Sequence, residues 1–306
     1  MITFFTTPKP FRGQLAVTQR NALHSWKLLH PDAEVIVFGD EDGAAAACRE
    51  LGLRHEPEIQ RNDQGTPYLN ALFDRAQDLA KHDLLCFLNC DILLMEDFHN
   101  AVSAAASAYP RFLMVGRRWD VRIEAPLDFS SADWGQRVRA LALETNRQRP
   151  PQWIDYFVFP RGLFHGQILP FAVGRPGYDN WLIWKTRSLK VPVIDASEVM
   201  VAAHQNHDYS HHLDGEKGFW GGPETKANEK LLGPWWRFNT IEDATHRLTP
   251  RGVRRSFRHW PVLCSRAFGA ARSAIWFGLL DLTRPVRHRL GLRQGRNEEG
   301  RIVPRP

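Results

Sequence analysis

The sequence lacks the features that mark several large classes of protein. Its 306 residues include only four cysteines, Cys48, Cys86, Cys90 and Cys264, without the paired spacing found at zinc sites. No apolar run approaches the roughly 20 residues needed to cross a bilayer. The first residues lack the basic-then-apolar plan of a signal peptide. We therefore expect a reduced, cytoplasmic protein.

Several catalytic and nucleotide-binding motifs are also missing. No Gly-x-Gly-x-x-Gly follows the first strand-like run, and the Gly-rich phosphate loop with its Lys-Ser/Thr pair occurs nowhere. Both absences count against Rossmann oxidoreductases and P-loop enzymes. No His-Glu-x-x-His occurs, and the spacing of His204, His207 and His211 does not fix a tetrahedral site by itself, which disfavours a zinc hydrolase.

Basic charge is scarce outside the C-terminal part of the chain. Residues 251–306 hold 13 arginines, no lysine and three acidic residues, a net charge of +10. The whole chain carries +6, so the first 250 residues carry −4. Nucleic-acid binding by the main body is therefore not supported by its charge, and we expect no nucleic-acid partner.

What the sequence does contain is an ordinary globular composition, with 43% hydrophobic and 24% charged residues. Strand-like runs alternate with helix-like runs over the first hundred residues, which predicts an α/β domain with a mostly parallel central sheet, Rossmann-like in outline. Further strands are predicted after residue 110, and residues 203–240 have no clear period and are expected to form an ordered loop region. We expect two parts: a domain over 1–250, and a basic, amphipathic, helical extension over 251–306 with a disordered end.

Polar residues follow the predicted strands where each one ends. They are Thr6 and Thr7 after the first strand, Asp40 after the second, Asn89 and Asp91 after the fourth, and Arg117 and Arg118 after the fifth. In open α/β sheets, ligands bind beyond the carboxyl ends of the strands. Because buried polar groups are costly unless satisfied, Asn89 and Asp91 suggest either a ligand or a turn network.

These stretches resemble the GT-A glycosyltransferases, which transfer a sugar from a nucleotide-sugar donor. The resemblance rests on FFTTPKPFRG, VIVFGDEDG, CFLNCDILL, GRPGYDNW and HQNHDYSH, within roughly the first 210 residues. In that family an Asp-x-Asp motif ends this strand, and its last Asp binds Mn²⁺ or Mg²⁺. Here the motif is Asn89-Cys90-Asp91, so the metal-binding acid is kept and the first acid is replaced.

The resemblance implies roles for individual residues. Asp91 would bind the divalent cation, and His204 would complete the metal site, with His207 as the alternative; a hydrogen-bonded loop histidine is the competing interpretation. The expected donor-binding residues are Thr6, Gln19, Asp40, Thr66, Asn89 and Arg117.

The acceptor side is expected near the stretch GRPGYDNW. Asp179 would be the general base of an inverting enzyme, which takes a proton from the acceptor hydroxyl, or it would cap the helix that begins there. Trp181 and Asp155 are the expected acceptor contacts, and buried core is the alternative for Trp181 and Trp184.

The Arg-rich stretch after residue 251 interleaves Trp and Phe residues with arginines. A basic amphipathic helix on an anionic membrane, at its inner face, fits this pattern, and a helix packed on the catalytic domain is the alternative. A lipid-linked glycan acceptor would give the membrane interpretation a purpose, as in the biosynthesis of cell-surface polysaccharides. Two other functions stay open: a sugar-1-phosphate nucleotidyltransferase, and a non-catalytic carbohydrate-binding protein on the same fold.

Overall fold

A computed structural model describes residues 1–145, 147–206 and 220–257 of the chain. The compact unit that contains them runs from Met1 to His259. The expected boundary at residue 250 falls inside a β-hairpin of this unit, because Thr249 pairs with Gly252 across its turn. The rest of the expected basic extension, with its proposed membrane contact, lies outside the described residues, and so does His207.

The described residues form a nine-stranded sheet in the order β12-β11-β9-β6-β8-β4-β1-β2-β3. Its strands are β1 (Thr3–Thr6), β2 (Glu34–Phe38), β3 (Arg54–Glu56), β4 (Leu84–Leu88), β6 (Leu113–Val115), β8 (Tyr156–Pro160), β9 (Val193–Asp195), β11 (His246–Thr249) and β12 (Gly252–Arg255). A three-stranded sheet has the order β5-β10-β7, formed by β5 (Ile92–Leu93), β10 (Ala202–Gln205) and β7 (Arg118–Val121).

The large sheet is mixed but largely parallel. β1 pairs in parallel with β2 and β4, β2 with β3, and β9 with β6 and β11. β8 runs antiparallel to both β4 and β6. Because Tyr156 at the start of β8 pairs with Leu88 at the end of β4, the chain enters β8 from the carboxyl edge of the parallel strands. β8 therefore runs in the opposite direction to its two neighbours, β4 and β6.

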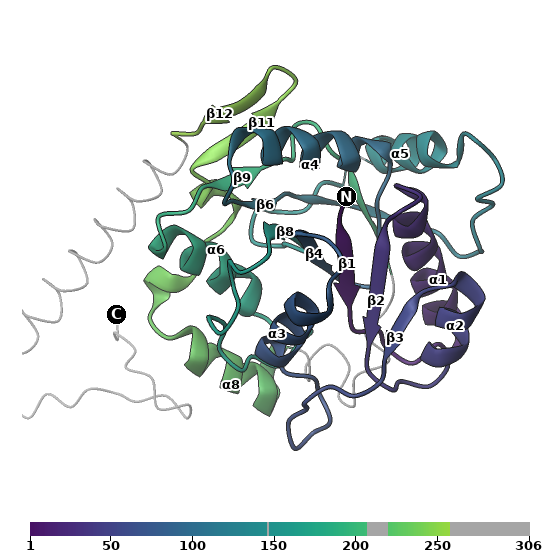
Figure 1. Ribbon diagram of the computed structural model, residues 1–306, viewed down its shortest axis with the longest axis horizontal. Helices are drawn as coiled ribbons and strands as arrows, with labels where there is room; N and C mark the ends of the chain where they lie inside the picture. The colour runs from purple at the N-terminus through teal and green to yellow at the C-terminus, as the bar shows by residue number, and fades with distance from the viewer. Residues whose placement is uncertain (146, 207–219, 258–306) are drawn as a thin grey trace, which may run out of the picture. The chain divides into compact units, whose positions relative to one another are not determined.

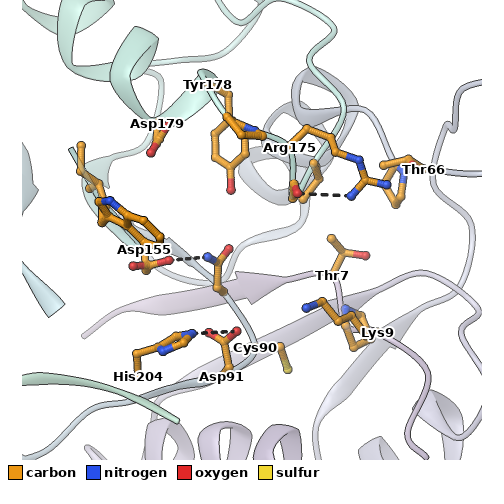
Figure 2. Close-up of a pocket in the computed structure, with 18 of the residues that line it drawn as sticks. Thr7, Lys9, Thr66, Cys90, Asp91, Asp155, Arg175, Tyr178, Asp179 and His204 are labelled. Atoms are coloured by element: carbon orange, nitrogen blue, oxygen red, sulfur yellow. Dashed lines mark hydrogen bonds and ion pairs between the residues drawn. The ribbon is translucent and has the colours of Figure 1, made fainter. Parts of the chain in front are cut away.

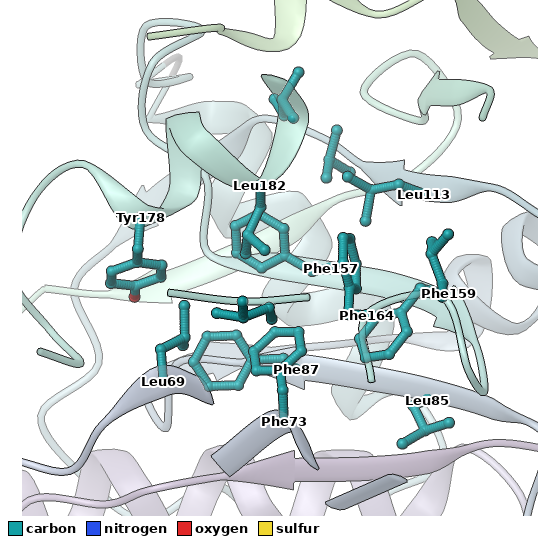
Figure 3. Close-up of a cluster of buried hydrophobic side chains, with 14 of the residues drawn as sticks. Leu69, Phe73, Leu85, Phe87, Leu113, Phe157, Phe159, Phe164, Tyr178 and Leu182 are labelled. Atoms are coloured by element: carbon teal, nitrogen blue, oxygen red, sulfur yellow. The ribbon is translucent and has the colours of Figure 1, made fainter. Parts of the chain in front are cut away.

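A layer of helices covers each face of the sheet, as Figure 1 shows. Side chains alternate between the two faces of a strand, so both faces carry apolar residues that need covering. Phe4, Cys86 and Leu88 point to one face, where they pack with residues of α1 (Gly13–Leu28) and α4 (Glu96–Ala108). Phe5 and Phe87 point to the other, against α3 (Leu69–Leu79) and α6 (Tyr178–Ser188). A fully buried Phe contributes about 1.5–3 kcal/mol, so the aromatic cluster in Figure 3 fixes the strands that carry the cavity described below.

The other helices are α2 (Ala44–Leu51), α5 (Trp134–Glu144) and α8 (Pro223–Leu232), with short 3₁₀ turns η1 (Trp235–Arg237) and η2 (Ile241–Asp243). α5 packs on the small sheet through Val138 and Ala142. No helix among the described residues is long and apolar enough to span a membrane.

Asn89 and Asp91 follow β4, as expected: the strand ends at Leu88, and the next three residues form a tight turn in which the Ile92 N–H donates to the Asn89 carbonyl. Two other expectations about the local structure are wrong. Arg118 begins a strand of the small sheet, where a loop was expected.

Residues 223–232 form α8 within the expected loop region. No helical period is visible in the sequence there, because only one of the four buried residues of α8 is apolar, Leu232. The other three, Glu224, Thr225 and Asn228, are polar. The buried face of α8 therefore carries almost no hydrophobic signal.

Candidate active site

A cavity of about 450 Å³ lies at the carboxyl ends of β1 and β4. Its walls come from the loop after β1, the turn after β4, the strand β10, and the segment that leads into α6 (Figure 2). Four of the expected site residues that line it are Asn89, Asp91, Asp179 and His204. Chain segments more than a hundred residues apart in sequence therefore meet at one edge of the sheet.

The turn Asn89-Cys90-Asp91 is held by Asp155, which directly precedes β8. The Asn89 N–H donates to the Asp155 carbonyl at 3.0 Å, and the Asn89 Nδ2 donates to the Asp155 Oδ1 at 2.7 Å. Cys90 is buried with Cys86 and Leu88, which anchors the middle of the turn in the core. Asn89 and Asp91 are thereby both left facing the cavity.

Arg118 and Asp155 form a buried ion pair in the cavity wall. The Arg118 Nη1 donates to both carboxylate oxygens of Asp155, at 2.9 and 2.8 Å, and its Nε lies 3.4 Å from the Asp120 Oδ1. The guanidinium also lies 4.9 Å from the ring centroid of Trp153. Because the Asp155 carboxylate binds Arg118 and Asn89, its first role in this structure is to position these two side chains.

His204 on β10 lies between two carboxylates. Its Nε2 is 3.6 Å from the Asp91 Oδ2, and its Nδ1 is 3.4 Å from the Asp120 Oδ1. Burial opposes the charged imidazolium and Arg118 repels it, but Asp91 and Asp120 outweigh both and raise the pKa of His204 to about 9. An imidazole whose second nitrogen faces a carboxylate is a common arrangement at metal sites, where that carboxylate fixes the ring.

The donor set of Asp91 and His204 fits a weakly coordinated divalent cation. Among the described residues, no group of three or more His, Cys, Asp or Glu side chains could hold a metal ion. The protein would thus supply two ligands: one carboxylate oxygen, and one imidazole nitrogen once the incoming cation displaces the proton of His204. Mg²⁺ commonly binds through one or two carboxylates, with substrate phosphates and water completing its shell. The residues present are compatible with such a site.

Asp179 lies in the first turn of α6 and lines the cavity opposite Asp91 (Figure 2). The helix begins at Tyr178 after Gly177, so Asp179 is not the N-cap residue that the sequence allowed, although its Oδ1 accepts the Gly177 N–H at 3.2 Å. Burial raises the pKa of Asp179 to about 7, and the Asp155 charge adds to the rise, against the backbone N–H donors. A carboxyl group that titrates near neutral pH is suited to accept a proton.

The loop before α6 is fixed by α8. Asn228 accepts the Ala172 N–H at 2.8 Å, and its Nδ2 donates to the carbonyls of Ala172, Arg175 and Pro176. One turn earlier on the same helix face, the Glu224 Oε2 accepts the Nε and Nη2 of Arg175 at 2.9 and 2.6 Å. α8 thus positions the segment that carries Arg175 and Asp179.

The other expected site residues are divided between the cavity and its surroundings. Thr66 and Asp155 line the cavity, and Gln19 lines it while both ends of its amide bind the backbone of Lys9. Thr6 is not among the lining residues, because its hydroxyl donates to the Leu88 carbonyl at 2.7 Å. The remaining expected residues also lie outside the lining. The exposed Asp40 pairs with Arg61 at 2.8 Å, Arg117 lies 3.9 Å from Glu242, and Trp181 packs in the core against Phe171 and Trp184.

Several lining residues were missed from the sequence. They include Lys9, Trp153, Arg175, Tyr178, Trp220 and Phe238. Lys9 stands inside the quoted stretch FFTTPKPFRG, so the loop after the first strand carried a usable signal. Arg175 likewise precedes the predicted helix by a few residues. No sequence pattern marked Trp220 or Phe238.

No protein-family model matches this chain, and no curated protein matches its sequence. Solved structures with a similar chain course include glucosyl-3-phosphoglycerate synthase from Mycobacterium tuberculosis with Mg²⁺ and UDP, at 16% identity and a TM-score of 0.47 over 78% of this chain and 79% of that one. Two others are S. aureus TarS with UDP-GlcNAc (11% identity, TM-score 0.42, 68% and 60%) and the mannosyltransferase PcManGT from Pyrobaculum calidifontis with GDP-Man and Mn²⁺ (15%, 0.41, 69% and 58%). The likeness to these three structures is one of chain course, at 11–16% identity.

Proposed function

We propose that the protein is an inverting glycosyltransferase that moves a sugar from a nucleotide-diphosphate sugar to a hydroxyl group of a glycan or glycolipid. One observation carries the proposal: a metal-compatible pair, Asp91 and His204, shares a single cavity with Asp179, whose carboxyl group titrates near neutral pH. Phosphate departure and acceptor deprotonation need these two functions at separate places in one site.

Each residue has a defined task in this scheme. A divalent cation at Asp91 and His204 would offset the negative charge that develops on the departing diphosphate. Asp179 accepts the proton of the acceptor hydroxyl as its oxygen attacks the sugar carbon. Arg118, held by Asp155, keeps the Asn89 turn and the His204 region in place. Trp153 and Phe238 line the cavity and offer aromatic surface on which a sugar ring can stack.

The direct test is a thermal-shift panel of nucleotide sugars with the full-length protein, with and without Mn²⁺. UDP-glucose, UDP-GlcNAc and GDP-mannose are suitable first probes. We expect at least one to raise the melting temperature, because binding to the folded state alone stabilises it by mass action. Slow release of the nucleoside diphosphate from that sugar should follow. A protein that binds none of a broad panel under either condition is not a glycosyltransferase of this kind.

A further inference from the structure

Lys9 is held rigidly in the loop between β1 and α1. It lies between Pro8 and Pro10, whose rings fix the backbone φ angle on either side. The Lys9 N–H donates to the Gln19 Oε1 at 2.6 Å, and the Gln19 Nε2 donates to the Lys9 carbonyl at 2.8 Å. Figure 2 shows the Lys9 side chain directed into the cavity, next to Thr7. The loop therefore presents this ammonium to whatever enters the cavity.

The Lys9 ammonium differs from the other cationic side chains of the cavity. Arg118 is paired with Asp155, Arg175 with Glu224, and His204 lies between two carboxylates. Within the described part of the chain, the Lys9 Nζ makes neither a hydrogen bond nor an ion pair. Burial lowers the pKa of Lys9, although the charge of Asp91 opposes that effect. A partly buried charge that makes no ion pair is costly, and an anionic ligand would reduce the cost.

Thr7 adds a second donor on the same loop. Its hydroxyl is buried and makes no hydrogen bond in the described structure, and it lines the same cavity. Hydrogen bonds from an ammonium and a hydroxyl to phosphate oxygens are strong because the acceptor is charged. The turn after β4 also carries Asn89 where a second acid would repel an anion. The cavity thus offers an ammonium and an unpaired hydroxyl to an incoming anion.

We propose that Lys9 and Thr7 bind the diphosphate of the donor directly, so that anion binding in this cavity does not depend entirely on a divalent cation. That the bound anion is a diphosphate rests on the proposed function, whereas the anion site itself rests on Lys9, Thr7 and their surroundings. Arg117, the other candidate that the sequence offered for this task, lies outside the cavity lining, and Arg118 is already paired with Asp155.

The test measures the binding of inorganic pyrophosphate and of UDP by titration calorimetry in excess EDTA, with the full-length protein. The variants are Lys9→Met, which removes the ammonium, and Lys81→Met, which makes the same charge change at an exposed residue before β4. We expect Lys9→Met to weaken pyrophosphate binding about tenfold or more, and Lys81→Met to bind like the wild type. Lys9→Met should melt at the same or a higher temperature, because it removes a partly buried charge that makes no ion pair.

Two results would overturn the proposal: wild-type protein that does not bind pyrophosphate in EDTA, or equal binding by Lys9→Met and the wild type. Failure of the proposed function looks different. If Lys9→Met loses pyrophosphate while no nucleotide sugar binds or is cleaved, the anion site stands and the glycosyltransferase does not. If a nucleotide sugar is cleaved with Mn²⁺ and the Lys9→Met substitution changes nothing, the function stands and the role of Lys9 is refuted.

Discussion

Replacing Asp179 with Asn tests the proposed base through both stability and activity. The carboxyl group lies in the cavity, in the first turn of α6, and burial raises its pKa to about 7 from the ordinary value of 3.8. Asn keeps an oxygen that can accept the Gly177 N–H but cannot ionise. The substitution therefore removes the charge while leaving the local geometry nearly intact.

The sign of the stability effect follows from the direction of the shift. A carboxyl group with a raised pKa in the folded state favours folding while it is protonated, and this contribution is lost as the pH rises from about 4 through about 7. Each unit of pKa difference is worth about 1.4 kcal/mol, so the cost of ionising Asp179 in the folded protein is at most on the order of 4 kcal/mol. We expect Asp179→Asn to be more stable than the wild type at pH 8, by a smaller margin at pH 5.

Denaturant unfolding of both proteins at several pH values measures this difference, and a transfer assay measures the chemistry. Loss of a general base lowers the rate about 10² to 10⁴-fold, whereas donor affinity should change little because Asp179 is not a ligand of the diphosphate in our scheme. Wild-type transfer should rise with pH and level off above about 7, where the carboxylate is ionised. A variant that retains full transfer, or that is less stable than the wild type at every pH, would refute the reasoning and leave Asp179 with a purely structural role.

Two further predictions concern the metal pair and α8. Asp91→Asn should abolish the extra stabilisation that Mn²⁺ gives to a nucleoside diphosphate complex in thermal-shift measurements; equal stabilisation of the wild type with and without metal would exclude the metal role. Asn228→Ala leaves three backbone carbonyls and one N–H of the loop before α6 without their partner, and should lower the free energy of unfolding by about 2–4 kcal/mol. Lys226→Ala, at an exposed position on the same helix, should change the free energy of unfolding by less than about 0.5 kcal/mol. An equal loss in both variants would argue against the role of Asn228 in holding this loop.

The pattern of apolar residues was enough to predict the first half of the fold. Strand and helix periods are local properties, so an alternation of strands and helices was expected over the first hundred residues, where the structure has β1, α1, β2, α2, β3, α3 and β4. The largely parallel order followed from the helices between the strands. Since parallel strands end at one edge, the sequence also predicted that Asp91 and Asn89 lie at a binding site on that edge. In the structure both residues line the cavity.

Tertiary structure decided the rest, because the deciding contacts are long-range. The direction of β8 depends on where the chain enters the sheet, and α8 buries polar residues whose partners lie some fifty positions away. Thr6, Arg117 and Trp181 do not line the cavity, because their side chains contact Leu88, Glu242 and Phe171. Lys9 does line the cavity, and Gln19 holds its loop in place. Residue types determined which chemistry was available to this protein, and packing between distant segments determined which of those residues reach the site.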